Sequence, residues 1–396
     1  MRVTIRPSRA MGNISAPPSK SVAHRLLICS ALAGGGSVSG LDYSGDILAT
    51  LDCLTALGFT YEKSGDRVSF TGGKLRPGTP CARESGSTLR FLAPLAALCV
   101  GQTTFTGSER LFLRPLGEYE RVFRERGLVF EKKSDSLTVS GLLSAGEYTL
   151  RGDISSQFVS GLLFVLPLLE GESTVRVIPP FESRSYVDMT VYCLGLFGIN
   201  IIKKDENTFF VPGGGKYIPA DTCVPGDFTN AAYLDAFSYI GGDVRISPVD
   251  GEIPQGDRIY KTLFEKLKNG PAQIDLSDTP DLAPVLFALA AALHGGTFTG
   301  CGRLRYKESN RIEAMCTELA KFGVELQSDG ERVTVGCTLK APGIPLCSHN
   351  DHRIVMALAP LCAITGGQIE GAEAVGKSFP GYFEIVSQLG VDIKWE

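Results

Sequence analysis

The sequence has few of the features that place a protein in a membrane or in an export pathway. Its longest mostly apolar run, Leu282 to Leu293, is interrupted by Pro284 and is shorter than the roughly 18–20 residues that span a bilayer. The first ten residues alternate polar and apolar side chains and lack the apolar core of about 7–15 residues found in signal peptides. We therefore expect a cytoplasmic protein with no membrane partner.

An excess of positive charge is also lacking. The formal net charge is -4 and the isoelectric point is near 5.8. Proteins that bind nucleic acids or anionic membranes need a basic face. No nucleic-acid partner is expected, and any binding of anions must be local.

Disulfide and metal frameworks are poorly supported. The 11 cysteines are odd in number and include no C-x-x-C pair. Several lie in apolar helical patterns: Cys29, Cys99, Cys316 and Cys362. Of the 4 histidines, only His349 and His352 are close together, without the spacing of a zinc site. We predict reduced core thiols and no structural metal.

The chain does have a large apolar fraction and an internal repeat. Hydrophobic residues make up 43% of the 396 residues, which suits a globular protein of about two to three domains. From Ser19 the pattern runs through an apolar helix, a short strand, a second helix, a glycine and another strand, and this order returns near residues 86, 155, 227, 281 and 351. A glycine after each second helix is typical of a helix C-cap: Gly58, Gly127, Gly198, Gly270, Gly323 and Gly390.

Six such stops predict six βαβαββ-type units in an α/β (α+β) protein. One unit cannot bury both faces of its own sheet, so units must pack together, and three per domain is the natural grouping. The turn-rich stretch 211–226 is the predicted boundary. A strand over Arg2–Arg6 is left over from the repeat and must complete a sheet that the pattern does not identify.

Unusual polar residues gather where the predicted helices begin, and helix N-termini bind anions through unpaired N–H groups and the helix dipole. At the first start, Ser21 and Arg25 are four residues apart and share a helix face. A serine cap on an ordinary helix is the alternative. No G-x-x-x-x-G-K-[ST] motif precedes this helix, which argues against a nucleotide kinase.

The next two helix starts repeat the theme. Gly86 permits close approach of a ligand to the backbone, with Arg90 one turn later and Arg114 at the following helix start. Further on, three polar residues in a row exceed what one cap needs: Ser155, Ser156 and Gln157. Ser183 and Tyr186 follow in the next turn. A hydroxyl-rich or phosphorylated ligand is favoured here over simple capping.

Cations gather in the last two units. We predict that the segment from Arg305 opens a helix with Lys307 and Arg311 at i, i+4, where two like charges weaken the helix. This cost indicates a function, although a solvated charge run offset by Glu308 is the alternative. Arg353 and Lys377 also precede helices. Asp281 and Asp351 suit helix caps, and Asp281 among cations also suits a general base.

These motifs, in this order and over essentially the whole chain, resemble the enolpyruvyl transferase family, and within it the EPSP synthases. The resemblance implies a two-domain enolpyruvyl transferase fold, with three units per domain around an interdomain cleft. It also implies that the chain crosses twice between the domains. One domain would then comprise residues 1–18 plus 226–396, including the N-terminal strand, and the other residues 19–225.

The reaction implied by the resemblance is transfer of the enolpyruvyl group of phosphoenolpyruvate to the 5-hydroxyl of shikimate 3-phosphate, with release of phosphate. Its partners are these two small molecules, and it needs no cofactor and no metal. A monomer is expected. The resemblance assigns Asp281 as general base, Glu308 as acid and base at the methylene carbon, and Lys20 as a group that shares proton transfer.

The binding residues implied by the resemblance fall into two sets. Shikimate 3-phosphate is assigned to Lys20, Ser21, Arg25, Ser155, Ser156, Gln157, Ser183, Tyr186, Asp281 and Lys307. Phosphoenolpyruvate is assigned to Lys20, Gly86, Arg90, Arg114, Gln157, Arg311, Arg353 and Lys377. The sequence departs from common family choices at Glu84, Ser87, Phe91 and Arg303. These departures leave sensitivity to glyphosate, an inhibitor of the family, as a hypothesis that a titration against phosphoenolpyruvate tests.

Three alternatives to this function are weighed against the residues present. The sibling transferase that acts on UDP-N-acetylglucosamine typically has Lys-Asn near its N-terminus and a reactive loop cysteine. Here Ser21 follows Lys20, and no loop cysteine of this kind is identified, although Cys81 lies in a turn. A noncatalytic phosphosugar-binding protein would have lost Asp281, Glu308 or Lys20. An RNA-end cyclase shares the repeated unit but is a shorter, one-domain protein.

Overall fold

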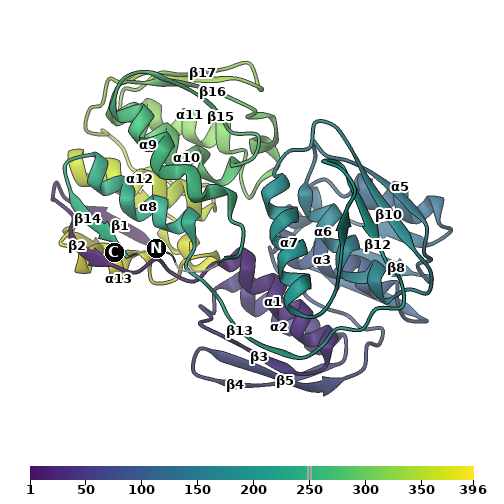
Figure 1. Ribbon diagram of the computed structural model, residues 1–396. Helices are drawn as coiled ribbons and strands as arrows, with labels where there is room; N and C mark the ends of the chain where they lie inside the picture. The colour runs from purple at the N-terminus through teal and green to yellow at the C-terminus, as the bar shows by residue number, and fades with distance from the viewer. Residues whose placement is uncertain (248, 250–251) are drawn as a thin grey trace. The chain divides into compact units, whose positions relative to one another are not determined.

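The computed structural model describes residues 1–247, 249 and 252–396, which form two compact units (Figure 1). The terminal unit contains both chain ends and comprises Met1–Pro17, Gly226–Asp250 and Gly256–Glu396. The middle unit comprises Pro18–Pro225 and Gly251–Gln255. Each has a hydrophobic core of its own.

Each unit is built around three helices that are apolar on nearly every side. In the middle unit these are α1 (Lys20–Ala33), α3 (Gly86–Ala96) and α6 (Ser156–Val165). In the terminal unit they are α8 (Phe228–Tyr239), α10 (Ala283–Ala292) and α12 (His352–Thr365). A helix that is apolar all round must be buried, and α12 buries every residue from His352 to Ala363. The N-termini of these core helices carry most of the predicted site.

Helices with a single buried face cover the core helices. In the middle unit they are α2 (Gly45–Ala56), α5 (Gly117–Glu125) and α7 (Arg184–Leu196). In the terminal unit they are α9 (Tyr260–Lys268), α11 (Arg311–Lys321) and α13 (Tyr382–Gln388). Short 3-10 turns complete the helical segments: η1 (Leu166–Leu168), η2 (Gly256–Ile259), η3 (Pro280–Leu282), η4 (Gly302–Tyr306) and η5 (Ala372–Lys377).

The strands of the described residues form six small sheets. Four of them share one order, in which an edge strand pairs parallel with the next strand and two antiparallel strands follow. In the middle unit these are β13 (Ala220–Cys223), β3 (Gly36–Ser39), β5 (Arg67–Gly73) and β4 (Phe59–Ser64), and then β9 (Glu147–Arg151), β10 (Ser173–Ile178), β12 (Thr208–Val211) and β11 (Ile202–Lys203). In the terminal unit they are β15 (Ala272–Asp275), β16 (Gly296–Thr299), β18 (Val333–Val335) and β17 (Leu326–Ser328), and then β19 (Leu346–Cys347), β20 (Gly367–Glu370), β1 (Arg2–Ile5) and β21 (Ile393–Trp395).

The other two sheets are shorter versions of this order. One contains β6 (Gln102–Thr106), β8 (Ser136–Ser140) and β7 (Val129–Lys132), with a parallel bridge from Cys81 to Thr106 at its edge. The other is the parallel pair of β14 (Asp243–Ile246) and β2 (Met11–Ile14).

Three strands lie in sheets far from their place in the sequence. The leftover N-terminal strand, β1, completes the last sheet by pairing with β20 and β21. The sequence did not predict β2, which pairs with β14, or the pairing of β13 with β3. The prediction that the leftover strand completes a sheet is therefore confirmed, and the first and fourth units also contain a strand from a distant part of the sequence.

The apolar pattern of the sequence predicts one helix that ends at Val100, one over 115–126 and one that ends at Leu169, and the structure differs at each. Helix α3 ends at Ala96 and not at Val100, because the N–H groups of Ala97 and Leu98 bond to carbonyls three residues earlier. The helix expected over 115–126 is α5, and the turn before it contains an extra helix, α4 (Glu109–Leu113). The helix expected to reach residue 169 ends at Val165 and continues as η1.

The cysteines only partly match the prediction of core thiols. All 11 are free, and Cys29 and Cys362 are buried in their helices as expected. Four others are exposed because they lie in loops or edge strands: Cys81, Cys223, Cys337 and Cys347.

Membrane-spanning helices and metal-binding clusters are both absent from the described residues. No helix there combines the length and apolar character needed to cross a membrane. No group of three or more histidine, cysteine or acidic side chains in residues 1–247, 249 and 252–396 is arranged to hold a metal ion.

Candidate active site

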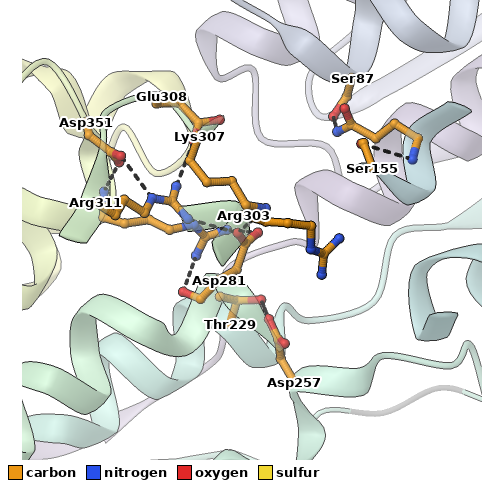
Figure 2. A network of polar contacts seen from close by, with 12 residues as sticks. Ser87, Ser155, Thr229, Asp257, Asp281, Arg303, Lys307, Glu308, Arg311 and Asp351 are labelled. Atoms are coloured by element: carbon orange, nitrogen blue, oxygen red, sulfur yellow. Dashed lines mark hydrogen bonds and ion pairs between the residues drawn. The ribbon is translucent and has the colours of Figure 1, made fainter. Parts of the chain in front are cut away.

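In the terminal unit, three cations converge on the carboxylate of Asp281 (Figure 2). Its Oδ1 accepts from Lys307 Nζ at 3.2 Å and from Arg311 Nη1 at 3.0 Å. Its Oδ2 accepts from Arg353 Nη2 at 2.8 Å. Asp281 lies in η3, immediately before α10, and its carbonyl accepts from Tyr233 of α8 at 3.1 Å. The start of the buried helix α10 therefore holds one anion among three positive charges.

Arg311 is the centre of this cluster. It is the first residue of α11 and only 1% of its side chain is exposed. Besides Asp281, its Nη2 contacts Glu308 Oε2 at 2.7 Å and its Nε contacts Asp351 Oδ2 at 2.9 Å. Three carboxylates around one buried guanidinium fix its orientation, because the planar fork of arginine bonds in defined directions.

The start of α12 supplies the next part of the cluster. Asp351 is the N-cap of this helix, and its Oδ1 accepts from the backbone N–H of Arg353 at 2.9 Å. The predicted cap is therefore confirmed, but the same side chain also accepts from Ser309 Oγ at 2.9 Å. Lys377, in η5, donates from Nζ to the carbonyl of Asn350 at 2.6 Å.

Two interpretations of this region were wrong. Lys307 and Arg311 do not share a helix face, because α11 begins only at Arg311 and Lys307 is extended. The expected repulsion within a helix is therefore not the reason for this pattern, since both cations pair with Asp281. Asp281 is not a helix cap either, because the N-cap of α10 is Leu282.

The charges in this cluster shift one another's pKa values. Burial by itself would raise the pKa of Asp281, but Arg353, Lys307 and Arg311 outweigh it and hold the pKa well below its usual range. Burial lowers the pKa of Lys307 to about 8, an effect that Asp281 opposes and that Arg311 and Arg303 reinforce. Without another anion, Asp281 is firmly ionised while Lys307 is close to losing its proton.

A buried acid lies beside this cluster. Asp257 accepts a hydrogen bond from Thr229, near the start of α8 (Figure 2). Burial, and then the negative charge of Asp281, raise the pKa of Asp257 to about 7. Sequence reasoning missed this pair. Arg303 also lies here, and its Nη2 donates to the carbonyl of Ser277 at 2.7 Å.

In the middle unit, the first predicted group surrounds the start of α1. Lys20 Nζ lies 2.7 Å from Asp46 Oδ2, and both side chains are mostly buried. Arg25 donates to the carbonyl of Ser21 one turn earlier at 2.7 Å and to that of Tyr186 at 2.9 Å. The shared helix face of Ser21 and Arg25 is thus confirmed. The N-cap position belongs to Ser19, whose side chain makes no capping bond.

The second group joins the starts of α3 and α6. Arg90 Nη1 donates to Gln157 Oε1 at 3.0 Å, and Gln157 Nε2 donates to Ser87 Oγ at 2.9 Å. A Cβ atom added to Gly86 would lie 2.9 Å from Arg90 Nη1 and 2.7 Å from Arg114 Cζ. The structure therefore brings Gly86, Arg90, Arg114 and Gln157 together.

The remaining predicted residues lie at the starts of α6 and α7. Ser155 caps α6 by accepting from the N–H of Gln157 at 3.3 Å, and Ser156 is buried directly after it. Ser183 occupies the N-cap position of α7 with a φ of 52°. Tyr186 follows in the first turn of that helix and contributes its carbonyl to Arg25.

A buried row of hydroxyl groups supports the middle-unit residues and was also missed. His24 Nδ1 bonds to Thr50 Oγ1 at 2.7 Å, Thr50 bonds to Thr88 at 2.7 Å, and Thr88 donates to the Oγ of Ser85, the cap of α3, at 2.7 Å. The row links α1, α2 and α3. Asp46, the partner of Lys20, was missed as well because an acid in the first turn of a helix is ordinary.

Solved structures with this fold define the class. The chain is similar to EPSP synthase from Acinetobacter baumannii, with a TM-score of 0.79, 23% sequence identity and coverage of 99% of both chains. A second structure of EPSP synthase from the same organism gives the same TM-score and identity over 100% of both chains. The chain therefore has the two-domain enolpyruvyl transferase fold, and the predicted fold class is confirmed.

Sequence comparison identifies the family within that class. The family model for EPSP synthase (3-phosphoshikimate 1-carboxyvinyltransferase) matches residues 5–386. A 3-phosphoshikimate 1-carboxyvinyltransferase from Clostridium kluyveri is 38% identical and covers 99% of this chain and 98% of its own length. One from Clostridium perfringens is 34% identical over 100% of both chains. The chain belongs to the EPSP synthase family, as the resemblance of its motifs implied.

Proposed function

We propose that this chain is a 3-phosphoshikimate 1-carboxyvinyltransferase, an enzyme of the shikimate pathway. It transfers the enolpyruvyl group of phosphoenolpyruvate to the 5-hydroxyl of shikimate 3-phosphate and releases phosphate. The observation that carries this proposal is the cluster around Asp281, in which a carboxylate is held among Lys307, Arg311 and Arg353. Family membership supports the same reaction.

The charge of the substrates matches the clusters. Two phosphoryl groups of roughly -1.5 to -2 each, together with the substrate carboxylates, bring about -5 into the site. The core helices of each unit add the positive ends of their dipoles, and α1 begins without a side-chain cap that would occupy its first N–H groups. When the substrates bind, the cations of these clusters give up some of their contacts with protein carboxylates and form contacts with the substrate anions.

The chemistry requires a base at oxygen and an acid at carbon. In the addition step the 5-hydroxyl loses its proton, its oxygen bonds to C2 of phosphoenolpyruvate, and C3 gains a proton. In the elimination step C3 loses a proton and the C2–O bond to phosphate breaks. We assign the first role to Asp281 and the roles at C3 to Glu308, with Lys20 sharing proton transfer.

The low pKa of Asp281 is consistent with a base that works only in the loaded site. In the free chain its three cations stabilise the carboxylate, which makes it a weak base. Bound substrate anions compensate those same cations, so the pKa of Asp281 rises towards the range in which it can accept a proton.

The binding assignments follow the two sets implied by the resemblance. We propose that shikimate 3-phosphate contacts Lys20, Ser21, Arg25, Ser155, Ser156, Gln157, Ser183, Tyr186, Asp281 and Lys307. We propose that phosphoenolpyruvate contacts Lys20, Gly86, Arg90, Arg114, Gln157, Arg311, Arg353 and Lys377. We also propose that the terminal and middle units are the two domains of the enzyme.

The direct test is release of phosphate from phosphoenolpyruvate with shikimate 3-phosphate as acceptor and UDP-N-acetylglucosamine in a parallel reaction. Release is expected only with shikimate 3-phosphate, with strongly reduced rates in Asp281→Ala and Glu308→Ala. Release with the nucleotide sugar would move the function to the sibling transferase. Tight binding without release would indicate a noncatalytic protein.

A further inference from the structure

A buried carboxylate of α11 lies two helical turns after Arg311 and outside the cluster around Asp281. The side chain of Glu318 is 0% exposed. Its Oε2 accepts from the backbone N–H of Cys347 at 2.9 Å, and its Oε1 accepts from His349 Nε2 at 2.8 Å. Lys321, one turn later, donates to both oxygens at 2.9–3.0 Å. One buried carboxylate thus fastens residues 347–349 to α11.

The fastened segment is a turn with an unusual backbone. His349 and Asn350 have φ values of 50° and 56°, in the left-handed region that non-glycine residues adopt only at an energetic cost. Two such residues in succession persist only where surrounding contacts hold them. The bonds from Glu318 to Cys347 and His349 are contacts of this kind, and the N–H of Asn350 adds another by donating to Ser348 Oγ at 3.1 Å.

The groups immediately after the fastened residues orient the cations assigned to phosphoenolpyruvate. The carbonyl of Asn350 accepts from Lys377 Nζ at 2.6 Å. The next residue, Asp351, accepts from Arg311 Nε at 2.9 Å and caps the helix that carries Arg353. A change in the turn therefore moves acceptors of Lys377 and Arg311 together.

We propose that Glu318 is a positioning residue for phosphoenolpyruvate binding, which acts by fastening the left-handed turn at His349 and Asn350. Helix α11 then fixes the site at two points, through Arg311 at its first residue and through Glu318 on the same face two turns later. This inference rests on the proposed function, because it concerns the cations assigned to phosphoenolpyruvate.

The test is steady-state kinetics of Glu318→Gln with each substrate varied in turn. The variant keeps the shape of the side chain but loses the charge that holds Lys321 and His349. The KM for phosphoenolpyruvate is expected to rise roughly 10-fold or more, because a small misplacement of binding groups has effects of this size. The KM for shikimate 3-phosphate is expected to change less than about twofold, within ordinary context effects for distant sites.

The middle unit offers a matched control. Glu118 of α5 is also buried, pairs with Arg121 three residues later, and accepts the backbone N–H of Arg151 at 2.9 Å. Glu118→Gln therefore removes a similar charge from a similar setting, and its KM for phosphoenolpyruvate is expected to equal that of the wild type. Equal effects of the two substitutions on this KM would overturn the proposal.

A second variant covers the case in which Glu318→Gln does not fold. His349→Ala removes the anchored, partly exposed side chain but keeps the cost of the left-handed backbone, so the fold is preserved and the turn is released. The same selective rise in the KM for phosphoenolpyruvate is expected, and its absence refutes the positioning role. An active wild type with unaltered KM values in the folded variants refutes this inference alone, whereas an inactive wild type refutes the proposed function as well.

Discussion

Replacing Gly86 with alanine tests whether the two arginines beside it bind substrate in the positions that the structure gives them. The new methyl group would overlap the guanidinium of Arg114, with Cζ at 2.7 Å, and would lie 2.9 Å from Arg90 Nη1. Both are far below ordinary van der Waals separations. Because the overlapping atoms are the ends of flexible side chains, the guanidinium groups are expected to move while the backbone of α3 stays in place.

The size of the effect follows from the interaction that is displaced. A hydrogen bond to a charged group contributes about 1.5–3 kcal/mol, so displacing one arginine from its phosphate or carboxylate partner weakens binding about 10- to 100-fold. We expect the KM for phosphoenolpyruvate to rise by this factor in Gly86→Ala. The melting temperature is expected to stay the same or rise slightly, because alanine favours the helix more than glycine does.

Steady-state kinetics and thermal unfolding of Gly86→Ala and Gly195→Ala test whether the two arginines bind phosphoenolpyruvate. Gly195 also lies within a helix, α7, but a Cβ atom there would have no heavy atom within 4 Å. Gly195→Ala therefore controls for the helix effect and is expected to leave the KM unchanged. A Gly86→Ala enzyme with the wild-type KM for phosphoenolpyruvate would refute the placement of Arg90 and Arg114 at that substrate.

Three further predictions concern charge. Burial, then the charges of Lys20 and Arg25, lower the pKa of His24 well below 6.5. Below about pH 6.5 the unfolded chain therefore binds a proton at this histidine that the folded chain does not. Through this group, stability falls by about 1.4 kcal/mol for each unit by which the pH is lowered. Urea unfolding at pH 7, 6 and 5 should show a smaller loss of stability in His24→Gln than in the wild type. The same dependence of unfolding free energy on pH in both proteins would contradict this prediction. Because burial brings the pKa of Lys307 to about 8, kcat/KM for shikimate 3-phosphate should decline above about pH 8 in the wild type and not in Lys307→Arg. The same decline of kcat/KM with pH in both enzymes would exclude Lys307 as the titrating group. Asp281→Asn leaves three cations without their shared carboxylate and should lower the free energy of unfolding by about 3 kcal/mol or more. Inorganic phosphate should then stabilise the variant more than it stabilises the wild type. Equal stabilisation of both proteins by phosphate would contradict anion binding at these cations.

The repeated units and the placement of the candidate site residues at helix starts could be predicted from the sequence, because both depend on local patterns. The N-terminal residues of α1, α3, α6 and α12 lie where the pattern places them. The start of α11 was misplaced although a local signal was present. Asn310 accepts from the N–H of Glu313 at 3.5 Å, and an asparagine followed three residues later by glutamate is typical of a helix start.

Other features depend on contacts that no local pattern carries. The pairing of β2 with β14 and of β13 with β3 joins segments far apart in the sequence, and short strands with few side chains in the core do not specify such partners. Asp46 and Glu318 look like ordinary acids on helices. Their importance arises from burial beside Lys20 and His349, which the fold alone determines.

The measurement that tests the central claim most directly is the identity of the product. Mass spectrometry of a reaction with phosphoenolpyruvate labelled with carbon-13 in the enolpyruvyl group and with shikimate 3-phosphate would follow the transferred group itself. The account predicts a product that retains the shikimate phosphate and carries the labelled enolpyruvyl group, with one phosphate released per product formed. Labelled pyruvate together with unchanged shikimate 3-phosphate would show hydrolysis without transfer and would contradict the account.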